Sequence, residues 1–376
     1  MGDREKKKLR TEFRKNRQPR TRERDLTRGF HESGDAFEEQ LDRDQRLSGK
    51  GELTRKRTVV GVESNDEHSG FGVLRDVDEA CLRGRVLAVY GLTSNVQTDD
   101  GRIYHCATRR LLKTLSTDLR QVVIAGDIVL FRPQGTDEGL IERVEPRHGL
   151  LCRASKGRQH VIVANVDQML IVASAAQPDI KPNLIDRFLV MAEKTRIRPI
   201  ICINKVDLVD PADFQPLVGV YGQMGYEVIL LSTVTGQGLN RIRRLLIGRE
   251  STVVGQSGVG KSSLLNAIDP SLNLRINEVS TETEKGKHTT TTAQLFRLST
   301  GGYVVDTPGI RQFELWDVIP EEVVNYYREL RPYVSRCKFP NCTHTHESDC
   351  AIKDAVADGR LDPRRYESYC HLRSGE

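Results

Sequence analysis

The 376-residue chain has no uninterrupted apolar stretch of about 18 residues, the length that a bilayer-spanning helix needs. Its first segment, MGDREKKKLRTEFRKNRQPR, lacks the apolar core and small-residue cleavage site of a secretory signal. Eight cysteines are too few for a disulfide scaffold in a chain of this length. These absences exclude an integral membrane protein and predict a cytoplasmic protein with thiols or metal-bound cysteines and no membrane partner.

The net charge of +5 is unevenly distributed. Residues 1–28 hold 12 Lys/Arg and 5 Asp/Glu, a net +7, whereas the other 348 residues hold 45 and 47, a net −2. Residues 1–78 also show little apolar periodicity, which predicts a largely disordered basic extension. Such a tail either neutralises phosphates without reading sequence or serves as a solvated, solubilising extension, and composition favours neither.

The length predicts two or three domains. Short β-branched runs separated by turn residues lie between Cys81 and Val144, and about five strands in roughly 65 residues are typical of a small closed barrel. For residues 79–150 we therefore predict an oligonucleotide-binding (OB) barrel that binds RNA, with a purely structural barrel as the alternative. The expected strands are Arg85–Tyr90, Arg102–Cys106, Val122–Ile124, Asp127–Phe131 and Gly139–Val144.

Strand-like and helix-like segments alternate from about Asn165, which predicts an α/β domain over residues 151–318 with a parallel sheet covered on both faces. The expected strands are Val166–Ala173, Pro199–Ile203, Glu227–Leu231, Thr252–Val254 and Tyr303–Val305, and the expected helices are Asn183–Lys194, Leu239–Leu246 and Ser263–Ile268. Right-handed crossovers would place the loops after the strands at one sheet edge. Residues 319–376 are predicted to form a small helical domain around a Cys/His cluster.

A glycine-rich segment between Val254 and Ser263 satisfies the pattern G-x-x-x-x-G-K-[ST]. Its glycines let backbone N–H groups point at a phosphate, and the following helix adds positive potential. Lys261 would neutralise the β/γ oxygens and Ser262 would ligate Mg²⁺. The predicted phosphate-binding residues are Gly255, Gln256, Ser257, Gly258, Val259, Gly260, Lys261, Ser262 and Ser263.

A second motif, Asn204-Lys205-Val206-Asp207, matches N-K-x-D and follows an apolar run. The Asp207 carboxylate can accept both guanine N–H donors, a pair that adenine does not offer, while Asn204 and the Lys205 stem shape the pocket. Ser232-Thr233 can contact the base through backbone amides. A lone tetrapeptide of this kind is more often an ordinary polar loop, but beside the phosphate motif it predicts GTP.

Two further segments are typical of nucleotide switches. Asp306-Thr-Pro-Gly309 matches D-x-x-G, in which Asp306 holds magnesium through water and the Gly309 N–H senses the γ-phosphate. The segment 285–292 carries four consecutive threonines, of which Thr290 is the predicted magnesium ligand and Thr289 the alternative.

The order of these motifs is unusual. N-K-V-D precedes the phosphate loop by about fifty residues and D-T-P-G comes last, whereas ordinary GTPases begin with the phosphate loop. The domain is therefore predicted to be circularly permuted, a change that preserves a fold when the old termini lie close together. The chain would then pass directly from the switch region into the carboxy-terminal domain.

The carboxy-terminal cluster Cys337-x4-Cys342-x-His344-x5-Cys350 supplies three thiolates and an imidazole, the soft four-ligand set of tetrahedral zinc. His346 can replace His344 on spacing alone. With no position open for water, the expected single zinc is structural.

The permuted order, the G-Q-S-G-V-G-K-S-S-L-L-N segment, N-V-D-Q at Asn165–Gln168, the H-T-T-T loop and the Cys/His cluster together resemble the ribosome small-subunit-dependent GTPase A family over about residues 80–370. The resemblance implies a barrel, a permuted GTPase and a zinc domain in a GTP hydrolase that acts late in small-subunit maturation. It selects His344 as the metal ligand. The long basic front is a departure from that family.

Catalysis poses a separate question, because Ile310 follows Gly309 where many GTPases place a water-orienting glutamine. His288 is the candidate to orient the attacking water, with Lys261 as the second catalytic residue, and the resemblance implies a catalytic histidine at this place. The alternative is a solvent-exposed loop histidine without a chemical role.

The leading hypothesis is a monomeric GTPase that binds the small ribosomal subunit and its rRNA, with the GTP state controlling attachment and release. An RNA-binding adaptor that uses GTP only as a latch, and a GTPase that acts elsewhere, are the competing hypotheses.

Overall fold

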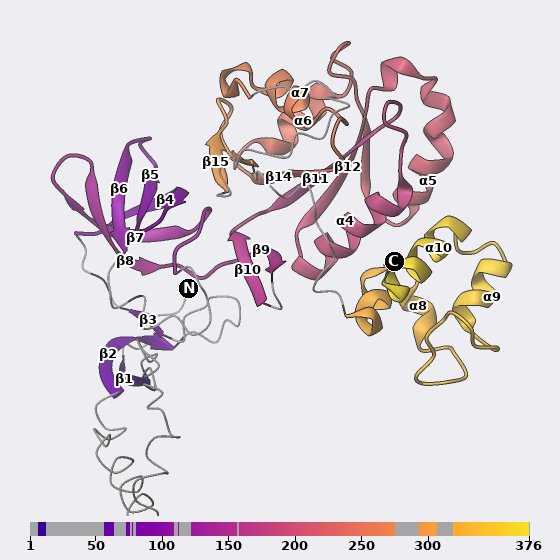
Figure 1. The fold of residues 1–376 in the computed structure, drawn as a ribbon, viewed down its shortest axis with the longest axis horizontal. Coiled ribbons are helices and arrows are strands. Elements are labelled where there is room, and N and C mark those ends of the chain that lie inside the picture. The colour runs from indigo at the N-terminus through magenta and orange to yellow at the C-terminus, as the bar shows by residue number, and fades with distance from the viewer. Residues whose placement is uncertain are drawn as a thin grey trace, which may run out of the picture.

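The computed structural model describes residues 7–12, 56–63, 73–75, 77, 80–108, 112, 122–155, 158–274, 293–306 and 319–375. A β-barrel, a central sheet with helices and a helical carboxy-terminal unit follow one another across the molecule (Figure 1). None of the helices in these ranges combines the length and the apolar character that crossing a membrane requires.

The barrel closes in the order β4-β5-β6-β8-β7, and its neighbours are antiparallel except for the parallel pair β6 and β8. Val86, Val96, Phe131 and Ile141 are completely buried in its centre. The prediction of a small closed barrel is confirmed. The strands are β4 (Leu82–Tyr90), β5 (Thr93–Thr98), β6 (Ile103–Thr108), β7 (Ile128–Gln134) and β8 (Glu138–Val144).

One predicted barrel strand is wrong and another was missed. Val122–Ile124 forms no strand, although Ile124 is buried and Val123 belongs to the barrel core, and the Ile124 N–H donates instead to the Asp127 carboxylate at 2.9 Å. Strand β5 escaped prediction because two of its inward-facing residues, Ser94 and Thr98, are polar and leave Val96 as the only apolar signal.

Three strands precede the barrel, namely β1 (Lys7–Glu12), β2 (Lys56–Glu63) and β3 (Val73–Arg75), and they form an antiparallel sheet in that order. These strands lie within the extension that the sequence predicts to be largely disordered, and for that extension as a whole disorder stays a prediction. The sequence of β2, KRTVVGVE, is rich in β-branched residues, whose stiffness favours extended backbone. The rest of the extension lies outside the described residues, and the boundaries of the four regions stay a prediction.

The central sheet has six strands in the order β13-β12-β11-β14-β16-β15, all parallel except the edge strand β15. Every residue of β11 and all but the first of β12 are buried, as both faces of the sheet are covered. The strands are β11 (Gln168–Ser174), β12 (Arg198–Asn204), β13 (Glu227–Leu230), β14 (Glu250–Val254), β15 (Gln294–Arg297) and β16 (Tyr303–Asp306).

Helices α4 (Pro182–Thr195) and α5 (Gln215–Gln223) contribute to one apolar cluster with the sheet. Helices α6 (Leu239–Leu246) and α7 (Lys261–Ile268) contribute to a second. The doubly covered, mostly parallel sheet agrees with the predicted fold class; β15 and α5 were not foreseen.

The N-V-D-Q segment joins the barrel to this sheet. The Asn165 side chain donates to the Gly126 carbonyl at 2.8 Å and accepts from the His148 N–H at 3.1 Å, while the Gln168 amide donates to the Ser251 hydroxyl at 2.9 Å. A hairpin of β9 (Leu151–Ser155) and β10 (Arg158–Val163) precedes this joint. The motif thus fixes how one unit continues into the next.

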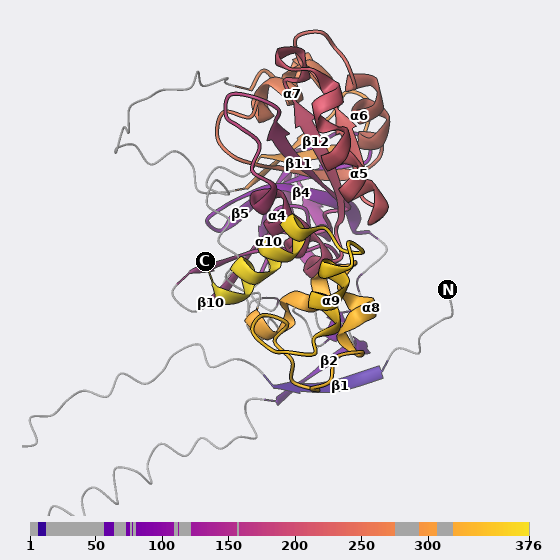
Figure 2. The same ribbon diagram turned by 90° about the vertical axis from the view of Figure 1, so that its right-hand side faces the viewer.

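The carboxy-terminal unit has its own core, which includes Tyr327, Leu330, Ile352 and Tyr369 and also receives Val190 from α4. Its helix α10 lies beside α4 in both ribbon views (Figures 1 and 2). Its elements are the 3₁₀ segment η6 (Pro320–Tyr326) and helices α8 (Arg331–Val334), α9 (Ala351–Ala357) and α10 (Pro363–Ser374).

Candidate nucleotide site and metal cluster

The glycine-rich loop lies at the carboxyl end of β14, where open α/β sheets bind ligands, and leads into α7. Gly255 and Gly260 both have positive φ, at 143° and 93°. A Cβ on Gly255 would lie 2.0 Å from the Val172 carbonyl oxygen, and one on Gly260 would lie 2.4 Å from the Asn204 amide nitrogen. Only glycine therefore allows the loop to lie this close to its neighbours.

Lys261, the first residue of α7, folds back over this loop. Its ammonium donates to the carbonyl oxygens of Gly255 at 2.9 Å and Gln256 at 2.7 Å. Ser262 and Ser263 follow in the first turn of the helix. The predicted cation and hydroxyls thus lie together at the helix amino terminus, where an anion is favoured.

The guanine motif is bonded directly to the phosphate loop. Asn204 is fully buried, and its side-chain amide donates to the Val259 carbonyl at 2.9 Å, while its side-chain oxygen has no hydrogen-bond partner. The Lys205 ammonium donates to the Gly258 carbonyl at 2.8 Å and also to the Gln177 carbonyl. Two motifs separated by about fifty residues are therefore in direct contact, as the prediction of a permuted GTPase domain requires.

Asp207 and Ser232 have different surroundings. Asp207 is exposed on the short 3₁₀ segment Val206–Leu208. Ser232 is fully buried, its hydroxyl accepts from the N–H groups of Val234 and Thr235 at 3.2 and 3.1 Å, and its own N–H donates to the Gln237 carbonyl. Ser232 therefore shapes the loop after β13, and its own amide is already engaged.

The predicted switch residues are only partly described. Asp306 ends β16, the parallel neighbour of β14, so the D-x-x-G motif begins at the same sheet edge as the phosphate loop. His288, Thr289, Thr290, Gly309 and Ile310 lie outside the described residues. Their roles stay predictions.

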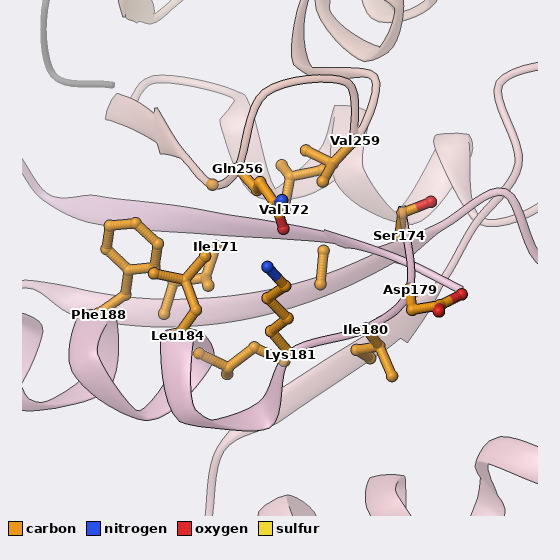
Figure 3. A pocket seen from close by; sticks show the side chains of 13 residues that line it. Ile171, Val172, Ser174, Asp179, Ile180, Lys181, Leu184, Phe188, Gln256 and Val259 are labelled. Carbon is orange, nitrogen blue, oxygen red and sulfur yellow. The ribbon is translucent and has the colours of Figure 1, made fainter. Parts of the chain in front are cut away.

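A small hollow lies beneath the phosphate loop, between β11 and the start of α4 (Figure 3). Lys181, the residue before α4, extends its side chain across this hollow toward Gln256. No motif includes Lys181, and the only sequence signal is a cation directly before Pro182. Residues at the beginning of α4 and residues of the phosphate loop therefore line the same hollow.

The four predicted metal ligands come together. One ligand atom from each of Cys337, Cys342, His344 and Cys350 lies within 4.8 Å of all the others. The His344 Nδ1 atom is 3.4 Å from the Cys337 sulfur and 3.5 Å from the Cys350 sulfur. This compact Cys₃His set has the donors and spacing to hold a metal ion.

Burial distinguishes the two candidate histidines. His344 is 3% exposed, whereas the His346 side chain is 80% exposed and its ring faces the Thr343 and Thr345 hydroxyls. Burial lowers the pKa of His344, which favours the neutral imidazole that binds metals. Burial also raises the pKa of the Cys342 thiol to about 12, so a bound cation is needed to hold this sulfur as a thiolate.

Comparisons with known proteins agree with this arrangement. A family model described as RsgA GTPase matches residues 144–316. A small ribosomal subunit biogenesis GTPase RsgA from Sodalis glossinidius is 41% identical over 292 residues, which are 76% of this chain and 83% of that protein. Its namesake from Pectobacterium carotovorum is 38% identical over 335 residues, covering 86% of this chain and 91% of that protein.

Solved structures are similar as well. The crystal structure of YjeQ from Thermotoga maritima matches with a TM-score of 0.66 and 36% identity over 78% of this chain and 98% of that one. YloQ, described as a circularly permuted GTPase, matches with a TM-score of 0.63 and 29% identity over 83% and 97%. With its permuted motifs, closed barrel and Cys/His cluster, the chain belongs to the RsgA family of circularly permuted GTPases.

Proposed function

We propose that the protein hydrolyses GTP to GDP and phosphate, binds the small ribosomal subunit during its late maturation, and attaches or releases according to nucleotide state. The observation that carries the proposal is the bonding of Asn204 and Lys205 to the phosphate loop, which combines a guanine motif and a triphosphate motif in one site. The names of the relatives support the partner.

In this proposal Lys261 neutralises the transferred phosphate, and Ser262, Asp306 and Thr290 hold Mg²⁺ directly or through water. The orphaned Asn204 oxygen and the glycine cradle fit a nucleotide at this place. Bound Mg²⁺ supplies charge neutralisation at the β- and γ-oxygens. Asp207 accepts the guanine N–H groups, and His288 orients the attacking water and handles its proton.

The metal is proposed to be one structural zinc per chain, and the protein a cytoplasmic monomer. The barrel and the zinc-bearing unit would contact ribosomal RNA. Tyr90, Leu92 and Ile103 are 48%, 73% and 47% exposed on the barrel, where unstacked bases could lie against them.

Co-sedimentation with small subunits tests this partner. Binding of the protein to the subunits should be stronger with a non-hydrolysable GTP analogue than with GDP, and it should weaken as the salt concentration rises. Equal binding in both nucleotide states would contradict the proposal.

We expect Asp207→Asn to change nucleotide choice. The substitution replaces an acceptor facing the guanine N–H donors by a donor. The affinity for GTP should therefore fall and the affinity for xanthosine triphosphate should rise. Each change should be about tenfold or more, because a mismatched hydrogen bond to a charged group costs about 1.5–3 kcal/mol. A binding titration with both nucleotides measures this. An unchanged preference would remove Asp207 from the pocket.

The substitution His288→Ala is expected to separate chemistry from binding. GTP affinity should stay close to wild type, whereas subunit-stimulated hydrolysis should fall by about 10²-fold or more, the usual contribution of a positioned proton-handling group. Single-turnover hydrolysis with excess subunits gives the rate. Normal turnover would assign the water to another residue.

A further inference from the structure

Helix α4 connects the two functional centres. At its beginning, the preceding loop is tied to the guanine motif, because the Ala175 N–H donates to the Asn204 carbonyl at 2.8 Å and the Lys205 ammonium donates to the Gln177 carbonyl. The first turn of α4 also lines the hollow beneath the phosphate loop (Figure 3). A displacement of these motifs would therefore be transmitted directly to the start of α4.

The first contact of α4 with the carboxy-terminal unit is a buried charge pair. Asp186 of α4 and Arg365 of α10 form an ion pair, with exposures of 1% and 3%. The Tyr221 hydroxyl donates to Asp186 at 2.8 Å, and the Arg365 Nε atom donates to Glu329 at 2.7 Å. The pair is thus enclosed by groups from α5 and from the carboxy-terminal unit, which carries the Cys/His cluster and is the metal-bearing unit of this proposal.

The second contact lies seven residues, or two turns, further along α4. Glu193 accepts from Arg328 at 2.6 Å and from Arg331 at 2.9 Å, and both arginines belong to the carboxy-terminal unit. The Arg328 guanidinium also lies 4.2 Å from the centre of the Tyr226 ring. Residues seven apart share one face of a helix, so one face of α4 carries both acidic contacts.

Such contacts fix orientation more than they add stability. For Asp186 and Arg365, taking the charges out of water offsets most of their attraction, yet removing one partner leaves an uncompensated buried charge. Paired charges hold α4 and the carboxy-terminal unit in one relative position, whereas a purely apolar interface would let the two slide past each other. A displacement of α4 would therefore move the metal-bearing unit with it.

We propose that α4 is a second, non-covalent route from the nucleotide site to the metal-bearing unit, with Asp186 and Glu193 as positioning residues. The inference rests on the proposed function, and it adds to the chain connection after β16. It requires that the nucleotide state changes how tightly the carboxy-terminal unit docks on α4. By thermodynamic linkage, docking of this unit then changes the relative affinities for GDP and GTP by the same factor.

The test uses the full-length protein without ribosomes. The dissociation constants for GDP and for a non-hydrolysable GTP analogue are measured, and their ratio is compared among variants. Arg365→Gln and Glu193→Gln should each change this ratio by about fivefold or more, within the usual range of coupling between sites. Arg364→Gln is the matched control: it removes the same charge one residue away on α10, where Arg364 forms its ion pair with Asp362 and attracts Asp186 only from a longer distance, so the ratio should change much less than in Arg365→Gln.

Metal content and far-ultraviolet circular dichroism show whether each variant is folded. If Arg365→Gln does not fold, the less enclosed Glu193 contact decides the question. An unchanged ratio in the folded variants overturns the proposal, as does an equal change in the control. Failure of the proposed function is distinguishable, because it appears as unstimulated hydrolysis of the wild type with subunits.

Discussion

We expect Lys261→Ala to abolish tight, magnesium-dependent GTP binding. The ammonium lies over the loop carbonyls of Gly255 and Gln256, at the helix end where the triphosphate is expected. Truncating one partner of a buried hydrogen-bonded charge pair costs about 2–5 kcal/mol, so affinity should fall by roughly 30-fold to several thousandfold.

Titration with a fluorescent GTP analogue in the presence of Mg²⁺ measures this loss. The melting temperature of the nucleotide-free variant is the control, and it should match that of wild type since the lysine is only partly buried. Retention of wild-type affinity would mean that the glycine-rich loop does not hold the triphosphate.

The second large effect is expected from Cys350→Ser. Cys350 is 1% exposed and lies between the other ligands and the core of the carboxy-terminal unit. Structural zinc in small units contributes about 10–16 kcal/mol, more than a unit of this size retains from its own core. The variant should therefore lose its metal and unfold residues 319–375, while the protein still binds nucleotide, with the ratio of GDP to GTP-analogue affinity changed as in Arg365→Gln.

Elemental analysis and hydrogen exchange of the two regions measure the outcome. Cys370→Ser is the matched control, because Cys370 lies outside the cluster and its loss should leave the metal content unchanged. A metal-free wild type would contradict the zinc assignment. Full protection of the carboxy-terminal amides in Cys350→Ser would contradict its structural role.

Much of the central domain could be predicted because its signals are local. Strands β11 and β12 are buried on both faces and appear in the sequence as continuous apolar runs. The phosphate and guanine motifs name their own residues, and the compact Cys/His spacing already implied a cluster. The structure adds that His344, and not the exposed His346, has the buried ring beside the sulfurs.

Other features depend on contacts that no local pattern carries. Strand β5 presents polar Ser94 and Thr98 to the interior, so its period is hidden. Asp186 and Arg365 look like ordinary surface charges in the sequence, since their burial arises only when α10 lies on α4. In the sequence, Asn165 and Gln168 stand out only as part of the family resemblance, and their role in joining the barrel to the sheet depends on hydrogen-bond partners that are distant along the chain.

GTP turnover with and without purified small ribosomal subunits tests the central claim most directly, with large subunits as the control. The account predicts slow turnover by the protein alone and no stimulation by large subunits. Small subunits should raise the turnover rate at least tenfold, on the scale of a positioned catalytic group. This stimulation should be lost in His288→Ala. Turnover that small subunits leave unchanged, or that large subunits raise equally, would contradict it.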